Sequence, residues 1–213
     1  MKRRVPAILA ASALALGAVT ATGAPATAQA AAGEDALASV LLADGNRFDS
    51  NAKDFDIVTQ AVLAVAEAKP DSPVTVLADG SKRLTAFAPT DQAFRKLAQD
   101  LTGQNIKSEK KLFGALVDLA GVDTIETILL YHVVAGQTLT SNKVLKADGA
   151  TLTTAQGGTI KVDVTTKPSL SITLKDADKN DRDPMVVLKS LDINKGNKQV
   201  AHGIDRVLRP IDL

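Results

Sequence analysis

Apolar residues recur at helical spacing along much of the first half of the chain. In the segment that follows Asp54, the residues Phe55, Val58 and Val62 fall on one side, and polar residues separate them. This spacing matches the 3.6-residue period of an amphipathic helix. Asp54 stands where a helix cap is expected, and Pro70 stands just past the end. The pattern therefore predicts a helix over residues 55–68.

Four further helices are predicted by the same period and by residues that favour helix starts. One begins at Pro89, Thr90 and Asp91, where Thr90 or Asp91 can accept hydrogen bonds from the free amides of the first turn. Another begins at Ser108, with Leu112, Leu116 and Leu119 on its apolar side. The four predicted helices are 36–42, one that starts at 89–91, one that starts at 108, and 123–131.

The second half of the chain instead alternates between apolar and polar residues, which is the period of a half-buried strand. Residues 159–164 and 169–174 show this alternation most clearly. Earlier in the chain, residues 74–77 and 82–88 flank an Asp-Gly pair and predict a β-hairpin, because these residues tolerate the positive φ angles of a tight turn. Helices in the first half and strands in the second favour a single α+β domain.

The first 30 residues have the three parts of a secretory signal peptide. Lys2, Arg3 and Arg4 precede an apolar run, and small residues then lead to an Ala-Gln-Ala cleavage site. The apolar run, 5–19, is short for a bilayer span, so we expect cleavage rather than a retained membrane anchor. The expected organisation is a signal peptide at 1–30, an N-terminal extension with a short helix at 31–53, and the folded domain at 54–213.

Composition limits the functions open to the secreted chain. Of 25 basic and 24 acidic residues, three basic and no acidic ones lie in the signal peptide, which leaves 22 against 24 and a net charge of −2. This balance argues against a nucleic-acid binder, which would carry a basic stripe. The chain has no cysteine, so neither a disulfide framework nor a thiolate metal site is available. Aromatic residues make up 3% of the chain, so aliphatic side chains must fill the core.

Two histidines, His132 and His202, are the residues that could carry catalysis. A pair of imidazoles could bind a metal or act as acid and base, but these two are far apart in the sequence and no third ligand stands out. No nucleophile motif of a serine hydrolase accompanies them, and an offset of three on a strand turns Asp205 away from His202. We expect both histidines to be half-buried and bonded to backbone or hydroxyl groups. The sequence predicts no catalytic, metal or cofactor site.

The acidic loop 176–183 has oxygen-bearing side chains at the first, third and fifth positions of a calcium-binding loop. Its sixth position is Asp181 instead of glycine, and its twelfth is Val187 instead of a bidentate glutamate. Lys179 and Arg182 also place positive charge inside the loop. We interpret the loop as a solvated hairpin tip, with weak calcium binding at extracellular millimolar levels as the alternative that stays open.

Three motifs follow one another along the chain. They are Thr-Ala-Phe-Ala-Pro-Thr-Asp-Gln-Ala-Phe at 85–94, Leu-Tyr-His-Val-Val-Ala-Gly at 130–136, and Val-Ala-His-Gly-Ile-Asp-Arg-Val-Leu-Arg-Pro at 200–210. In order and spacing they resemble the signatures of the fasciclin domain, an extracellular module associated with adhesion and matrix contacts. Lys198-Gln199 stands where the family usually shows Asn-Gly. The resemblance covers roughly 54–210 and implies a single α+β domain, a wedge of two β-sheets flanked by several α-helices.

The resemblance implies a secreted, bacterial, non-enzymatic adhesion module. Its partner would be an extracellular protein or a polymer of the cell surface, cell wall or matrix. The candidate partner-binding or fold-signature residues are Tyr131, His132, Thr90, Asp91 and His202, of which the Tyr-His pair belongs to a region linked to adhesive contacts in some family members. Two alternatives stay open, a structural self-association module and a hydrolase that uses His132 or His202. We expect a monomer that binds no nucleic acid and does not insert into a membrane once the signal peptide is removed.

Overall fold

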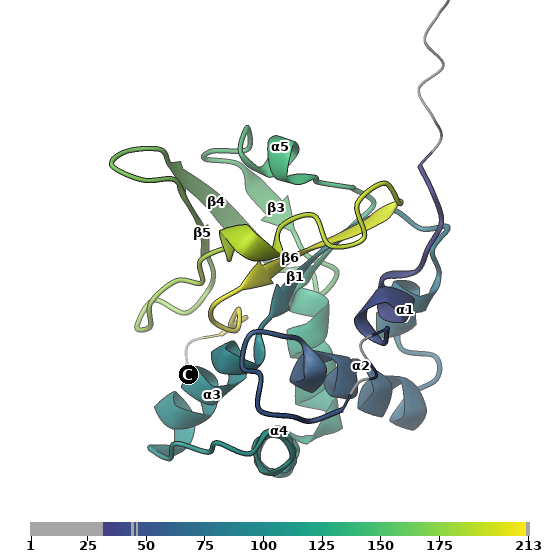
Figure 1. Cartoon of the computed structure of the whole chain (residues 1–213), viewed down its shortest axis with the longest axis vertical. Coiled ribbons are helices and arrows are strands. Elements are labelled where there is room, and N and C mark those ends of the chain that lie inside the picture. Colours follow the sequence, from purple (N-terminus) through teal and green to yellow (C-terminus); the bar gives the residue numbers. More distant parts are fainter. Residues whose placement is uncertain (1–31, 44, 46, 212–213) are drawn as a thin grey trace, which may run out of the picture. The chain divides into compact units, whose positions relative to one another are not determined.

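Two three-stranded sheets form the framework of the fold (Figure 1). The computed structural model describes residues 32–211 except Asp44 and Asn46, so the predicted signal peptide lies outside the described residues. In the first sheet, the central strand β1 runs antiparallel to β2 and parallel to β6. The second sheet, β3-β4-β5, is antiparallel throughout. The strands are β1 Leu84–Pro89, β2 Val133–Ala135, β3 Thr151–Thr153, β4 Thr159–Thr165, β5 Ser171–Lys175 and β6 Gln199–Ile204.

Three long helices, α2, α3 and α4, gather on one side of the first sheet, and the second sheet lies on the other side (Figure 1). The α+β class and the two-sheet arrangement predicted from the sequence are therefore confirmed. No helix in the described part of the chain is long and apolar enough to cross a membrane. The helices are α1 Leu37–Leu41, α2 Asp56–Ala68, α3 Asp91–Thr102, α4 Glu109–Tyr131 and α5 Ser141–Val144, with 3₁₀ turns η1 Pro73–Ala78 and η2 Leu188–Ser190.

Strand β1 lies at the centre of the fold because both of its faces are covered. Leu84, Ala86 and Ala88 pack into the core shared with the helices. Phe87, on the opposite face, packs into a second core with the inner side chains of β3, β4 and β5. A strand buried on both faces has no solvent side that needs polar residues, which explains why this segment is almost continuously apolar.

The predicted helices are confirmed, with two differences. The helices expected from Ser108 and at 123–131 form the single element α4, which is interrupted where Gly121 has φ 71° and ψ 165°. The Ser108 hydroxyl accepts the Lys111 N–H and so caps the start of α4, as expected. Leu119, expected on the apolar side of this helix, lines an apolar pocket there but is 57% exposed.

The predicted hairpin over 74–77 and 82–88 is wrong. Residues 73–78 form the 3₁₀ turn η1, which Pro73 begins and the Ser72 hydroxyl caps by accepting the Val74 N–H at 3.1 Å. β1 takes its two partners from distant parts of the chain instead. An Asp-Gly pair favours a tight hairpin turn. The backbone groups on both edges of a buried strand must be hydrogen-bonded, and in β1 these bonds are made with β2 and β6.

The stretch predicted as an N-terminal extension packs against β6. The Gly33 N–H donates to the Gly196 carbonyl at 2.9 Å, and the Leu37 N–H donates to the Gln199 side chain at 2.8 Å. The side-chain NH₂ group of Gln199 donates hydrogen bonds to the carbonyls of Val76 and Asp79. One buried glutamine therefore joins α1, η1 and β6.

Candidate functional site

His132 lies at the carboxyl end of α4, where both of its ring nitrogens bond to the main chain. Nε2 accepts the Leu208 N–H at 2.9 Å, so the ring proton sits on Nδ1 and is donated to the Ile128 carbonyl at 2.7 Å. Burial lowers the pKa of this imidazole to about 4. The ring is therefore neutral near pH 7, and neither nitrogen is left to act as a base or a metal ligand.

His202, on β6, is bonded in the same way. Its Nδ1 accepts the Asp192 N–H at 3.2 Å, and its Nε2 donates to the Leu139 carbonyl at 2.7 Å. Burial lowers the pKa of the ring. Asp205 bonds elsewhere, to the Met185 N–H and the Lys96 ammonium. Both histidines are bonded to the backbone as expected, but they are fully buried instead of half-buried, with 4% and 0% of their surface exposed. Neither ring has a free nitrogen that could act as the base of the hydrolase alternative.

Tyr131 lies under the second sheet and is only 1% exposed. Its hydroxyl donates to the Thr159 carbonyl at 2.8 Å, and burial raises its pKa to about 12. The ring packs so closely on Gly158 that an added Cβ there would lie 2.8 Å from a ring carbon. Tyr131 thus fastens the end of α4 to β4 and has almost no surface to offer a partner.

Replacing Tyr131 by phenylalanine should lower the free energy of unfolding by about 1 kcal/mol, because the Thr159 carbonyl loses its donor while the apolar ring stays. Thermal unfolding should record this as a fall in Tm of roughly 2–4 °C. Partner binding, measured well below the Tm where both proteins are folded, should be unchanged. A variant with an unaltered Tm and lost binding would show instead that Tyr131 contacts the partner.

Thr90 and Asp91 are both buried at the junction of β1 and α3. The prediction that one of them caps α3 through its side chain is wrong, since Thr90 occupies the cap position without a side-chain hydrogen bond. Asp91 Oδ1 instead accepts the Ile57 N–H at 3.0 Å and so caps α2. Asp54, expected to cap α2, does not do so. The sequence offered no local signal for this long-range cap.

Three aspartates of the 176–183 loop bind arginines of the C-terminal segment. Arg209 Nη1 donates to buried Asp178 at 3.0 Å, and the Arg209 main-chain N–H donates to Asp176 at 2.8 Å. Arg206 donates to both oxygens of Asp181 at 3.0 Å. The interpretation as a solvated hairpin tip is therefore wrong for Asp178, whose carboxylate is part of a buried ion pair.

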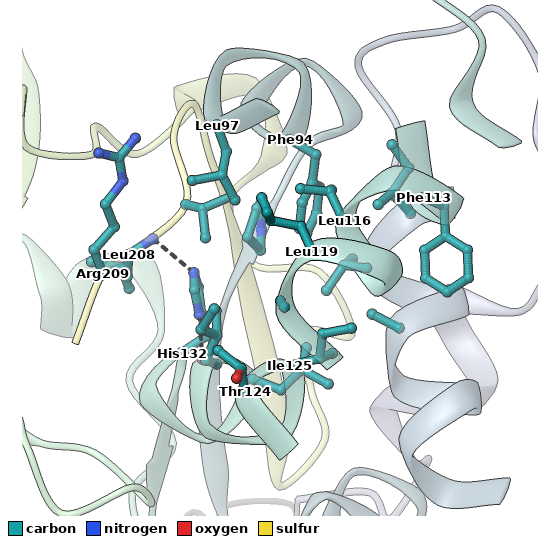
Figure 2. A pocket seen from close by; sticks show the side chains of 18 of the residues that line it. Phe94, Leu97, Phe113, Leu116, Leu119, Thr124, Ile125, His132, Leu208 and Arg209 are labelled. Carbon is teal, nitrogen blue, oxygen red and sulfur yellow. Dashed lines mark hydrogen bonds between the residues drawn. The ribbon is translucent and has the colours of Figure 1, made fainter. Parts of the chain in front are cut away.

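An apolar pocket of about 380 Å³ lies on the helical side of the fold. Figure 2 shows Phe94, Leu97, Leu116 and Leu119 around it, and His132 bonded to the Leu208 amide at one wall. We call this cavity the helical pocket; its lining comes from α2, α3, α4 and residues 207–210. The sequence does not predict this pocket, because helical spacing places Leu119 on the apolar side of its helix but does not show how closely the helices pack.

The five candidate residues do not form one site. His132 contacts the helical pocket, whereas Tyr131 belongs to the core between the sheets and Asp91 lies at the start of α3. His202 packs beside Phe87, with ring centroids 6.1 Å apart. All five are buried, and the side chains of all except Thr90 form hydrogen bonds with the main chain.

A family model describing the fasciclin domain matches residues 58–210, which is most of the chain and includes all three motifs. The chain belongs to the fasciclin domain family. A fasciclin-family structure to which it is similar is the FAS1 domain pair of the insect cell adhesion molecule fasciclin I. That match has 20% identity and a TM-score of 0.48, and it covers 71% of this chain and 46% of the solved one. This fasciclin-domain chain thus spans about half the length of that solved chain, and no curated protein matches it significantly.

Proposed function

We propose that this protein is a secreted, non-enzymatic binding module that contacts an extracellular protein through the helical pocket. The observation that carries the proposal is an open apolar cavity whose rim includes Leu101 and Leu119, which are 39% and 57% exposed. Membership of the fasciclin domain family supports adhesion as the general role. Secretion follows from the predicted signal peptide, with Ala31 near the start of the mature chain.

The chemistry of the pocket favours a protein over a polysaccharide as partner. Its walls are mostly aliphatic and aromatic, and its polar lining residues are Thr124, His132 and Arg209. Both ring nitrogens of His132 are bonded to the main chain, and the Arg209 guanidinium is paired with aspartates. A sugar polymer would bury hydroxyl groups there without partners, which is costly. A leucine or phenylalanine side chain would gain about 1.5–3 kcal/mol on entering such a pocket, as buried anchors do at protein interfaces.

Replacing Leu119 by lysine should weaken partner binding about tenfold or more, because the charged head would have to lose water as the partner covers the rim. The Tm should stay within about 2 °C, since Leu119 is already exposed. The assay is capture of cell-surface proteins from the organism of origin on immobilised mature chain, followed by titration with the captured partner.

The matched control is Leu188→Lys, an exposed leucine at 43% that does not line the pocket. Retained binding by Leu188→Lys and loss by Leu119→Lys would support the proposal. Equal binding by both variants would contradict it. Self-association through the same pocket is the second candidate function, and a sedimentation coefficient that rises with the concentration of the mature chain, but not of Leu119→Lys, would favour it.

A further inference from the structure

Gly121 interrupts α4 beside the helical pocket. Its φ of 71° and ψ of 165° lie in a region of backbone space that is almost closed to residues with a side chain. The chain is helical before and after it, so α4 consists of two halves, 109–120 and 122–131. Figure 1 shows that the two halves run in different directions. The turn between them therefore depends on this one residue.

Both halves of α4 line the pocket, one on each side of the turn. Phe113, Leu116 and Leu119 come from the first half, and Ile125 and His132 from the second half and its end. In Figure 2, Leu116 and Leu119 lie along the upper side of the cavity and Ile125 along the lower side. An uninterrupted helix is nearly straight and would present these residues as a single wall. The interruption at Gly121 lets one helix form two walls.

The first half of α4 is fixed firmly only at its first turn. There Glu109 is buried and accepts hydrogen bonds from the Asp49 N–H and from Arg95, and Leu112 is buried as well. All of the residues 113–120 are half-buried or exposed. Since little packing holds this stretch, its direction is set by the backbone at its two ends. It runs about 12 Å from Phe113 to Gly121, so a change of direction of about 30° at the turn displaces its far end by about 6 Å.

The space around Gly121 is open, so the backbone conformation is what requires glycine. A Cβ added there would meet no atom within 4 Å. Alanine would therefore make no clash and lose no contact, but it would disfavour the positive φ. We infer that Gly121 is a positioning residue for partner binding, which holds the first half of α4 as the outer wall of the helical pocket and so keeps the pocket open. This inference rests on the function proposed for that pocket.

The test measures the pocket directly with N-phenylnaphthylamine, a neutral apolar dye that fluoresces more strongly out of water. A cavity of about 380 Å³ with apolar walls is of the size that takes small apolar ligands. Gly121→Ala should bind the dye about tenfold more weakly than the wild-type mature chain, at a temperature where both are folded. Partial unfolding acts in the opposite direction, because loosened proteins expose apolar surface and bind more of such dyes.

Two other glycines supply matched controls, because an added Cβ at either would also meet nothing within 4 Å and neither lines the pocket. Gly103 ends α3 with φ 70°, so Gly103→Ala introduces a comparable backbone strain elsewhere and should lower the Tm by roughly 2–4 °C. Gly114 lies in the helical part of the first half, so Gly114→Ala should strengthen that helix. Both control variants should bind the dye as the wild type does.

Weaker dye binding by Gly121→Ala alone would support the inference. Unchanged binding by Gly121→Ala, an equal loss in either control, or a wild type that binds no dye would overturn it. If Gly121→Ala does not fold, the double variant with Gly114→Ala replaces it, because the second alanine restores helix stability. Failure of both to fold would assign Gly121 to the fold instead of the pocket and would also overturn the inference.

The dye experiment is independent of the partner. The proposed function fails if Leu119→Lys and Leu188→Lys bind the partner equally well, whatever the dye shows. The role of Gly121 fails if Gly121→Ala keeps an open pocket, whatever the partner is.

Discussion

Replacing Arg209 by methionine should destabilise the protein by about 3–5 kcal/mol, the largest effect we expect of a single substitution. The Arg209 side chain is 7% exposed and holds Asp178, whose side chain is 1% exposed, at 3.0 Å. It also holds Asp100 at 2.7 Å, so that it joins α3 to the 176–183 loop. Methionine keeps the volume of the stem but leaves the Asp178 carboxylate buried without its charge partner, which is the costly case for a buried ion pair.

The control for this substitution is Arg206→Met. The Arg206 side chain is more exposed, and its partners Asp100 and Asp181 keep Arg209 as a second cation. Its loss should therefore cost only about 1 kcal/mol. The double variant Arg209→Met with Asp178→Asn should recover part of the lost stability, because the buried charge is gone while the amide oxygen can still accept the Asn180 N–H. Urea unfolding gives the free energy of unfolding of the wild type, the two arginine variants and the double variant. Equal losses of stability for the two arginine variants would contradict the account.

Replacing His132 by alanine should lower the free energy of unfolding by about 3 kcal/mol at pH 7. The variant leaves the buried Leu208 N–H without an acceptor and opens a cavity at the end of α4. In a domain of this size the loss should appear as a fall in Tm of roughly 6–12 °C. A fall of less than about 2 °C would show that His132 does not support the fold.

The same histidine should make stability depend on pH. Burial lowers its pKa in the native state from the ordinary histidine value of 6.5 to about 4, so the unfolded chain binds more protons between these pH values. The contribution of His132 is thus complete above pH 6.5 and is lost as the pH falls towards 4, by about 3 kcal/mol in all.

Two carboxyl groups change the stability with pH in the opposite direction. Burial raises the pKa of Asp91 to about 8 and that of Asp176 to about 6, so in this window the native state keeps protons that unfolded carboxyls release. The quantity to measure is therefore the difference in the free energy of unfolding between the wild type and His132→Ala. This difference should shrink by about 3 kcal/mol from pH 7 to pH 4. A difference that stays constant over that range would contradict the neutral, buried state of His132.

The sequence predicted those elements whose patterns are local. Helix α2 and strand β4 have one buried face each, so the helical and alternating periods identify them directly. Strand β1 is buried on both faces and pairs with residues more than a hundred positions away in β6, and nothing in its own sequence encodes that register. The local Asp-Gly rule therefore gave a false hairpin at η1.

The site was predicted less well, for a related reason. The motifs identified Tyr131 and His132, but which atoms bond to them depends on Thr159 and Leu208, which come from other parts of the chain. The exposure of Leu119 arises because the helices leave a pocket between them, which no helical period reveals. Burial of Asp178 likewise required Arg209 to reach the loop from the C-terminal segment.

The central claim is that the signature residues hold the fold together while the rim of the helical pocket binds the partner. The most direct test measures Tm and partner affinity for Leu119→Lys and Tyr131→Phe in parallel. We predict that Leu119→Lys binds the partner about tenfold more weakly with little change in Tm. Tyr131→Phe should have a lower Tm and an unchanged affinity for the partner. Loss of affinity in Tyr131→Phe, together with full binding by Leu119→Lys, would contradict the claim.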